Sequence, residues 1–343
     1  MPVAKIRDRS LGDVHSQVLQ DTIKRLHNTW ENFKQKGCGF PRFKKFGQFK
    51  SFLFPQFKDN PITGHHVKLP KIGLVTINVH RPIPDGFTVK QVRILSKCRG
   101  TQWYAVVCIQ SEVSVPEVGL HGRAIGIDLG LERFLTTSDN FSVERPKFFK
   151  SKQSQLKLLQ RRGARKQKLS HNWEKAQVKI ARLHNHIGNA RKDFHLKIAH
   201  KLCDQAETIF AEDLNTVGLN RGMLRKECVD ASFGQFLSLT KWVCWKRGAY
   251  FQRVNPNGTS QACPQCLTSV RKELKEREHF CPECGYQTHR DHAAAEMVLI
   301  VGSSVVPVDT RGTETVCAGV LTGAEMSSQV PKSRKRATRK ANS

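Results

Sequence analysis

Residues 123–140 read RAIGIDLGLERFLTTSDN, and this pattern sets the architecture of the second half of the chain. An apolar run ends in Asp128, a glycine-containing turn follows, and a second apolar run returns, which predicts two consecutive buried strands. A carboxylate inside a buried run costs free energy unless it is paired or binds a cation. We therefore predict that a domain begins here and that Asp128 takes part in chemistry.

Two further carboxylates stand at the ends of predicted elements. Glu212 follows the apolar run TIFA, at the end of a second buried strand, and Asp291 precedes AAAEMVL at a helix start. Three converging carboxylates repel one another, and two Mg²⁺ ions about 3.5–4 Å apart would relieve that repulsion, activate water and stabilise the leaving oxygen of a phosphodiester. The pattern predicts a nuclease site of Asp128, Glu212 and Asp291. A helix N-cap stays an alternative interpretation for Asp213 and Asp291.

Four cysteines occur as two close pairs. Cys263-Pro-Gln-Cys266 is followed, after fourteen residues, by Cys281-Pro-Glu-Cys284. Paired thiolates three residues apart reach one tetrahedral ion from a tight turn, and two such turns complete a four-cysteine zinc site. Because four thiolates fill the coordination sphere, we predict a structural zinc ribbon and no catalytic role for this metal. The nearby His279 and His289 are interpreted as surface or nucleic-acid contacts.

Composition limits the class of partner. The chain has 343 residues, enough for two or three domains, and a formal charge of +28, which favours a polyanion such as nucleic acid. No apolar run approaches the roughly 18–20 residues that span a bilayer, and the first residues lack the apolar core of a signal peptide. We expect no membrane partner, a cytoplasmic location and reduced cysteines. No phosphate-binding loop, H-E-x-x-H or G-x-S-x-G motif marks another enzyme class.

The segment 147–201 is strongly basic and contains only two acidic residues, Glu174 and Asp193. Apolar positions recur at helical spacing, which predicts two long helices joined near residues 170–172. A solvated charged face is the simpler interpretation, but the scarcity of acidic partners favours a surface that follows phosphates. The predicted nucleic-acid contacts are Arg161, Arg162, Arg165, Lys166, Lys168, Lys179, Arg182, Arg191 and Lys192.

The first 120 residues show different periodicities. Residues 11–36 have apolar positions at helical spacing, whereas β-branched runs between 66 and 113 predict a small antiparallel sheet or barrel. Between them, residues 37–57 alternate Phe with Lys and Arg. This alternation is typical either of aromatic residues that stack on bases or of a half-buried strand with a basic outer face.

Several of these features occur together in one known family. Gly-Ile-Asp128-Leu-Gly, the basic helical pair, Glu212-Asp-Leu-Asn, Phe233-Gly-Gln-Phe, Thr259-Ser-Gln, the split cysteine pairs and Arg290-Asp291 resemble the TnpB family of transposon-encoded proteins, formerly labelled OrfB-type transposases. The resemblance covers about residues 10–320. It implies an α+β and α/β multidomain fold: a β-barrel wedge domain with a helical recognition segment, then a ribonuclease H-like (RuvC) mixed sheet.

The resemblance also implies domain boundaries. The expected order is a partial helical recognition segment (1–43), a β-rich wedge domain (44–120), a RuvC-like core (121–258) with a basic helical insertion (147–205), a zinc ribbon (259–290), the last RuvC-like helix (291–302) and a disordered basic tail (303–343).

Family members bind an RNA transcribed from the end of their element and use it to guide DNA cleavage. The resemblance therefore implies that Asp128, Glu212 and Asp291 are catalytic, and that structural zinc and two catalytic Mg²⁺ ions are the cofactors. It also implies a guide RNA, a double-stranded DNA target and a functional link to a separate transposase. It implies a bacterial or archaeal, nucleoid-associated protein. Two departures stand out: members usually begin with an extra wedge strand and further recognition helices, and the family motif Asp-Arg-Asp-x-Asn has His289 and Ala293 here. The alternative function is a catalytically weak or inactive nucleic-acid-binding regulator of transposition.

Overall fold

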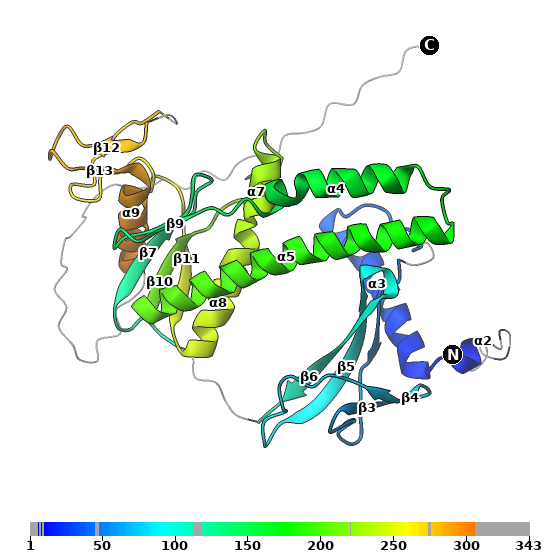
Figure 1. The fold of residues 1–343 in the computed structure, drawn as a ribbon. Coiled ribbons are helices and arrows are strands. Elements are labelled where there is room, and N and C mark those ends of the chain that lie inside the picture. The colour runs from blue at the N-terminus through cyan, green and yellow to red at the C-terminus, as the bar shows by residue number, and fades with distance from the viewer. Residues whose placement is uncertain are drawn as a thin grey trace, which may run out of the picture. The chain divides into compact units, whose positions relative to one another are not determined.

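The computed structural model describes residues 10–44, 48–112, 118–219, 221–273 and 276–305, together with Ile6 and Asp8. It combines several sheets with long helices in a mixed α/β arrangement (Figure 1). The predicted strands on either side of the turn after Asp128 are confirmed, because both lie in one five-stranded sheet.

The order of strands in this sheet is β11-β10-β7-β8-β9. β7, β10 and β11 are parallel neighbours, β8 is antiparallel to β7, and β9 is antiparallel to β8. The bounds are Ala124–Asp128 for β7, Arg133–Thr137 for β8, Ser142–Glu144 for β9, Thr208–Glu212 for β10 and Tyr250–Val254 for β11.

Helices cover both faces of the sheet because successive side chains of each strand alternate between them. Ile125, Ile127 and Ile209 pack with Leu202 of α5 and Phe236 of α8 in one core cluster. On the other face, α9 covers the sheet (Figure 1), and Phe210 and Val254 pack with Val298 of this helix. The helices are α4 (Phe148–Ala164), α5 (His171–Gln205), α6 (Thr216–Leu219), α7 (Arg225–Ala231), α8 (Phe233–Arg247) and α9 (Arg290–Val305).

The predicted basic helical pair is confirmed as α4 and α5. Ser170 lies in the connection, and its hydroxyl oxygen accepts a hydrogen bond from the backbone N–H of Trp173 at 3.2 Å, which fixes the start of α5. The start of α4 is held from a distant part of the chain, because the carboxylate of buried Asp230 accepts from the backbone N–H of Phe149.

The described part of the first 110 residues forms helices and two three-stranded antiparallel sheets. The predicted helix over 11–36 is interrupted at extended His15, so α2 and α3 are separate. One sheet has the order β1-β5-β6, the other β2-β3-β4. The bounds are α2 (Ser10–Asp13), α3 (Ser16–Lys36), β1 (Ser51–Phe54), β2 (Ile62–Thr63), β3 (His66–Leu69), β4 (Gly73–Thr76), β5 (Thr88–Lys97), the short 3₁₀ helix η1 (Cys98–Gly100) and β6 (Gln102–Gln110).

The expected β-barrel wedge is not confirmed, since the described residues form no closed barrel. The two sheets share an apolar core around Phe54, Val67 and Val92, but within the described residues β4 and β6 each have one strand neighbour. A groove of about 1480 Å³ lies open beside them instead of a closed interior. Local β-branched patterning predicts strands, whereas closure depends on pairing between distant segments that the pattern does not contain.

The segment after β11 forms a small hairpin that leads into α9. Its strands are β12 (Glu278–Phe280) and β13 (Gln287–His289), which pair antiparallel. α9 begins at Arg290 and continues to Val305, three residues beyond the expected end of the last helix at 302. The rest of the expected tail, 306–343, lies outside the described residues. No helix in the described ranges combines the length and apolarity needed to cross a membrane.

Candidate metal-binding active site

The three predicted carboxylates line one pocket of about 250 Å³. Asp128 ends β7 and Glu212 ends β10, and these strands are parallel neighbours, so their carboxyl ends meet at the same edge of the sheet. Asp291 reaches the pocket from the first turn of α9. The structure therefore brings together three residues that are separated by up to 163 positions in the sequence (291 − 128).

Close packing of α9 on the sheet places Asp291. Ala293, Ala294 and Ala295 are buried, and α9 contacts β7 more extensively than any other strand. Gly126 makes this approach possible, because a Cβ atom there would lie 2.1 Å from the carbonyl oxygen of Ala295. The small side chains of the alanine-rich run and the absence of a side chain at Gly126 together allow α9 to pack closely on β7.

Both proposed N-cap interpretations are wrong. Asp213 is exposed and forms an ion pair with Arg253 at 3.3 Å, while Asn215 caps α6 by accepting from the backbone N–H of Gly218. Asp291 lies inside α9, and its own backbone N–H donates to His289 Nδ1 at 3.2 Å. His289 therefore satisfies the helix start, and the carboxylate of Asp291 is left for the pocket.

Electrostatics in this pocket favour a bound cation. Burial, with the nearby charges of Glu212 and Asp291, raises the pKa of Asp128 to about 8. Burial also raises the pKa of Glu212, and a hydrogen bond from Thr259 opposes that rise. A bound cation stabilises the ionised carboxylates that burial and mutual repulsion destabilise. The three carboxylates therefore fit a divalent, oxygen-binding ion.

Among the described residues, the four cysteines are the group of three or more whose ligand atoms all lie within 4.8 Å of one another. The three carboxylates share their pocket without meeting that spacing.

Two arginines and a threonine complete the site, and sequence reasoning assigned them no role. Arg277 and Arg290 line the pocket, and Arg277 also forms an ion pair with Glu132 at 2.7 Å. Thr259 is buried and donates a hydrogen bond from Oγ1 to Glu212 Oε1. Their positions beside the cysteine pairs were the signal that could have revealed them. Arg277 lies just before the second pair, and Thr259 lies four residues before Cys263.

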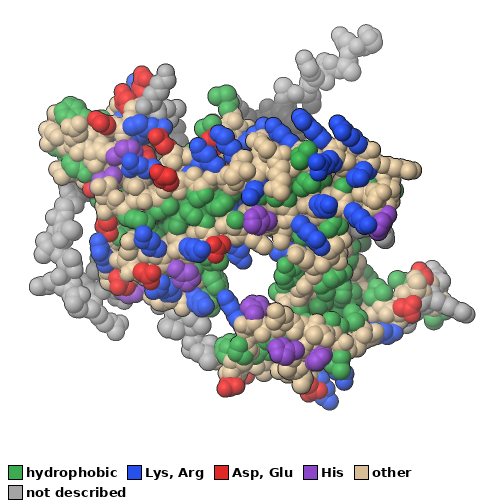
Figure 2. Space-filling model, viewed as in Figure 1, with side chains coloured by type: hydrophobic (Ala, Val, Ile, Leu, Met, Phe, Trp, Pro, Cys, Tyr) green, Lys and Arg blue, Asp and Glu red, His purple; other side chains and the backbone are tan. Residues whose placement is uncertain are grey.

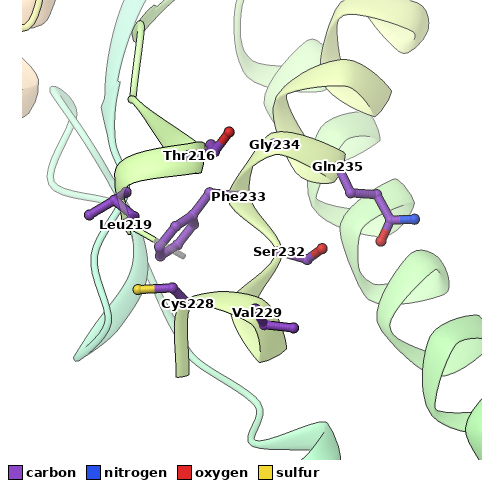
Figure 3. A pocket seen from close by; sticks show the side chains of 8 residues that line it. All are labelled: Thr216, Leu219, Cys228, Val229, Ser232, Phe233, Gly234 and Gln235. Carbon is purple, nitrogen blue, oxygen red and sulfur yellow. The ribbon is translucent and has the colours of Figure 1, made fainter. Parts of the chain in front are cut away.

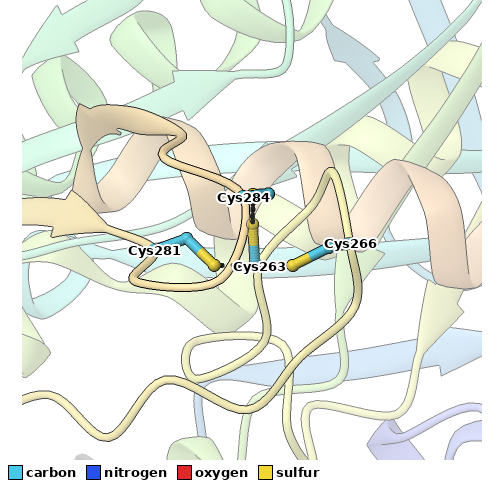
Figure 4. Close-up of side chains that lie close together, drawn as sticks. All are labelled: Cys263, Cys266, Cys281 and Cys284. Carbon is cyan, nitrogen blue, oxygen red and sulfur yellow. Dashed lines mark hydrogen bonds between the residues drawn. The ribbon is translucent and has the colours of Figure 1, made fainter.

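The four cysteine sulfurs form a separate cluster (Figure 4). The Sγ atoms of Cys263 and Cys284 lie 3.6 Å apart, and those of Cys266 and Cys281 lie 3.4 Å apart. Tetrahedral zinc with Zn–S bonds of about 2.3 Å requires sulfurs about 3.8 Å apart, so the cluster fits this ion. Hydrogen bonds from Thr268 lower the pKa of Cys266 to about 6, which favours the thiolate that zinc binds.

Most of the predicted nucleic-acid contacts lie on an exposed basic surface of α4, α5 and their connection, where Lys and Arg side chains gather (Figure 2). Eight are exposed, and none of these eight forms an ion pair within the described part of the chain. Arg191 differs, since its guanidinium donates to the carbonyl oxygens of Val229 and Asp230 and lies 3.9 Å from the Asp230 carboxylate. The eight exposed residues are Arg161, Arg162, Arg165, Lys166, Lys168, Lys179, Arg182 and Lys192.

A further pocket of about 190 Å³ lies between α6, α7 and the start of α8 (Figure 3). Ser232 connects α7 to α8 with a left-handed φ of 56°, and Phe233 and Thr216 border the same space. No charged side chain lines this pocket, in contrast to the carboxylate pocket, so it lacks the groups for phosphodiester chemistry.

Comparison with known proteins places this fold and site among the transposon-encoded nucleases. A family model described as "Probable transposase" (OrfB_IS605) matches residues 106–222, and one described as "Cas12f1-like, TNB domain" matches residues 233–298. The chain is 30% identical over 313 residues to "Putative RNA-guided DNA endonuclease InsQ" of Escherichia coli (strain K12), covering 86% of this chain and 77% of that protein. The chain belongs to this TnpB family.

Other similarities are more distant. A "Putative RNA-guided DNA endonuclease" of Streptomyces pristinaespiralis is 29% identical over 300 residues, covering 85% of this chain and 73% of that protein. Among solved structures, the "Cryo-EM structure of the Cas12f1-sgRNA-target DNA complex" has a TM-score of 0.48 at 13% identity, covering 78% of this chain and 67% of that chain. The "Cryo-EM structure of CRISPR-Cas12f Ternary Complex" has a TM-score of 0.42 at 14% identity, with 83% and 70% covered.

Proposed function

We propose that the protein is an RNA-guided, Mg²⁺-dependent DNA endonuclease encoded by a transposable element. The observation that carries the proposal is the convergence of Asp128, Glu212 and Asp291 on one pocket, in which the pKa of Asp128 is raised to about 8 by burial and neighbouring carboxylates. Both relatives are named putative RNA-guided DNA endonucleases, which supports DNA as the substrate and RNA as the guide.

The strand arrangement supports a ribonuclease H-like, RuvC-type core. Its order β11-β10-β7-β8-β9, with β8 antiparallel to parallel β7, β10 and β11, places Asp128 on the central strand. Around this core we propose a helical recognition segment at 1–43, a wedge domain at 44–120, the basic insertion at 147–205 and the zinc ribbon at 259–290.

Each side chain of the pocket has a proposed task. Asp128, Glu212 and Asp291 would hold two Mg²⁺ ions, which when bound would supply an activated water and stabilise the leaving oxygen. Arg277 and Arg290 line the same pocket and attract the phosphodiester by charge. Arg277 also forms an ion pair with Glu132, which is exposed to solvent and would exchange readily for a phosphate.

The exposed basic surface on α4 and α5 would hold the guide RNA paired with the target DNA strand. Arginines and lysines without ion-pair partners neutralise phosphates and release counterions, whatever the base sequence. Guide pairing would then supply sequence specificity, with the protein reading duplex shape. The four cysteines would hold structural zinc. We also propose a functional link to a separate transposase, as the family resemblance implies.

Two adjacent carboxylates give a matched test. Glu212 lines the pocket, whereas Asp213 is exposed and paired with Arg253. We would purify the ribonucleoprotein with its guide and measure cleavage of a guide-matched plasmid with Mg²⁺ or with EDTA. We expect Glu212→Gln and EDTA to abolish cleavage and Asp213→Asn to retain it. Equal cleavage by Glu212→Gln and the parent would refute the site.

A regulator that binds without cutting is the second candidate function. It is favoured by His289 and Ala293, which stand where the family motif has Asp and Asn, and Ala293 is buried at the start of α9. The same plasmid assay separates the two functions. Saturated binding of the guide-matched DNA by the parent, without any Mg²⁺-dependent product, would establish the regulator.

A further inference from the structure

We propose that Thr259 is a positioning residue that orients the Glu212 carboxylate and thereby links the zinc ribbon to the magnesium site. The inference rests on the proposed function and goes beyond it by assigning the ribbon a task at the active site. Glu212 ends β10, and the sheet fixes its backbone but leaves the rotation of its side chain to other contacts.

The contacts of Thr259 hold its hydroxyl in place as a hydrogen-bond donor. The residue is only 2% exposed, its Oγ1 donates to Glu212 Oε1, and the same Oγ1 lies 2.9 Å from the carbonyl oxygen of Pro256. A hydroxyl has one hydrogen to donate, and an ionised carboxylate is the stronger of the two acceptors. One oxygen of Glu212 is thereby held by protein, and Oε2 remains for a cation.

The turn that carries Thr259 is part of the ribbon. The backbone N–H groups of Gln261 and Ala262 donate to Gly258 O at 3.1 and 3.0 Å, and Gly258 has a φ of 89°, which favours glycine. Val270 N–H donates to Gln261 O at 2.7 Å, which ties this turn to the chain beyond the first cysteine pair. Closing the four-cysteine cluster therefore also fixes the turn at Thr259.

The far end of the ribbon reaches a second carboxylate. β13 runs directly into α9, where His289 Nδ1 accepts from the Asp291 backbone N–H and Arg290 N–H donates to Arg277 O at 2.8 Å. The ribbon thus contacts the elements that carry Glu212 and Asp291, whereas Asp128 lies on β7, within the five-stranded sheet. Loss of zinc is expected to weaken magnesium binding while the sheet stays folded.

The test measures cation binding to the full-length protein without nucleic acid, by calorimetric titration with Mg²⁺. Thr259→Val removes the hydroxyl at nearly constant volume, and Thr259→Ser keeps it. Thr240→Val is the matched control, because Thr240 is also buried but donates to Phe236 O within α8. Thermal unfolding and zinc content identify any variant that fails to fold.

We expect Thr259→Val to weaken Mg²⁺ binding about tenfold or more, the usual effect of losing a group that orients a metal ligand, with Thr259→Ser and Thr240→Val close to the parent. Removing zinc with a zinc-selective chelator should weaken Mg²⁺ binding similarly. Equal Mg²⁺ affinities of Thr259→Val and Thr240→Val would overturn the inference. If the parent itself binds no Mg²⁺, the proposed function fails instead.

Discussion

Gly126 of β7 and Ala295 of α9 are in direct backbone contact: a Cβ atom at Gly126 would lie 2.1 Å from the Ala295 carbonyl oxygen and 2.6 Å from the Leu299 nitrogen. Both obstructing groups are backbone atoms in a helix, so neither can rotate away as a side chain would. The distance between α9 and the sheet, and with it the position of Asp291 relative to Asp128, depends on glycine at this position.

Gly126→Ala should therefore separate α9 from the sheet. We expect a loss of about 3 kcal/mol in the free energy of unfolding, at the upper end for an overpacked core, together with loss of cleavage. Gly188→Ala is the control, because Gly188 lies within α5 with nothing within 4 Å of an added Cβ. It should stabilise the protein by up to about 1 kcal/mol, as replacing glycine within a helix does. Denaturant unfolding of both variants checks this, and an equal response would contradict the packing argument.

Asp128 gives a prediction for the metal-free protein. Its pKa is raised to about 8, above the unfolded value of 3.8, so the folded state binds more protons between these two values. Asp128 should accordingly make the metal-free protein less stable as pH rises from about 4 to 8. Asp128→Asn cannot ionise, so it should raise the unfolding temperature near pH 8 without metal and abolish the stabilisation that Mg²⁺ gives the parent. Thermal unfolding with and without Mg²⁺ measures both effects.

The same raised pKa makes magnesium binding pH-dependent. A cation that binds the ionised carboxylate displaces the proton held below pH 8, so Mg²⁺ affinity should rise toward pH 8 and then level off. Calorimetry between pH 6 and 9 would show it. An Mg²⁺ affinity that does not change with pH would mean that the ion binds away from Asp128.

Local patterns predicted the elements but not all their contacts. The apolar runs ending in Asp128 and Glu212 predicted β7 and β10, and the cysteine spacing predicted a cluster that the structure brings within 4.8 Å. These signals lie in short windows of sequence. The predicted β-barrel was not confirmed, because closure depends on pairing between strands that are distant in the sequence. The role of Thr259 was missed because its hydrogen-bond partner, Glu212, lies 47 residues away.

Arg182 and Arg191 lie on the same helix but should behave differently. Arg182 is exposed, whereas Arg191 donates to two carbonyl oxygens beside Asp230, a carboxylate that also holds the start of α4. Arg191→Ala should cost about 2 kcal/mol or more of folding free energy, since it removes two hydrogen bonds to carbonyl oxygens and the cation beside a buried carboxylate, leaving Arg145 as the other nearby positive charge. Arg182→Ala should change stability by less than about 0.5 kcal/mol but weaken RNA binding and reduce its salt dependence by about one counterion. Urea unfolding and RNA binding over a range of salt separate the two. Reversed effects would assign Arg182 a structural role.

His195 predicts how the protein loses stability in acid. The ring is fully buried, stacks on Phe134 at 5.3 Å and lies 3.1 Å from the Ala231 carbonyl through Nε2. Burial lowers its pKa to about 4 from 6.5, so the unfolded chain takes up a proton near pH 6.5 while the folded chain does not until about pH 4. Stability should therefore fall as pH drops through this window, by about 3 kcal/mol in total from this residue.

His195→Gln keeps an amide nitrogen that can donate to Ala231 but cannot titrate. Buried carboxyls such as Asp128 and Asp230 have raised pKa values and change stability in the opposite direction, so the informative quantity is the difference between parent and variant at each pH. Urea unfolding at pH 7.5, 6, 5 and 4.5 should show that the variant loses less stability than the parent as pH falls. Parallel curves for the two proteins would mean that His195 has the same pKa in the folded and unfolded states, and that its contacts with Phe134 and Ala231 do not exclude the charge.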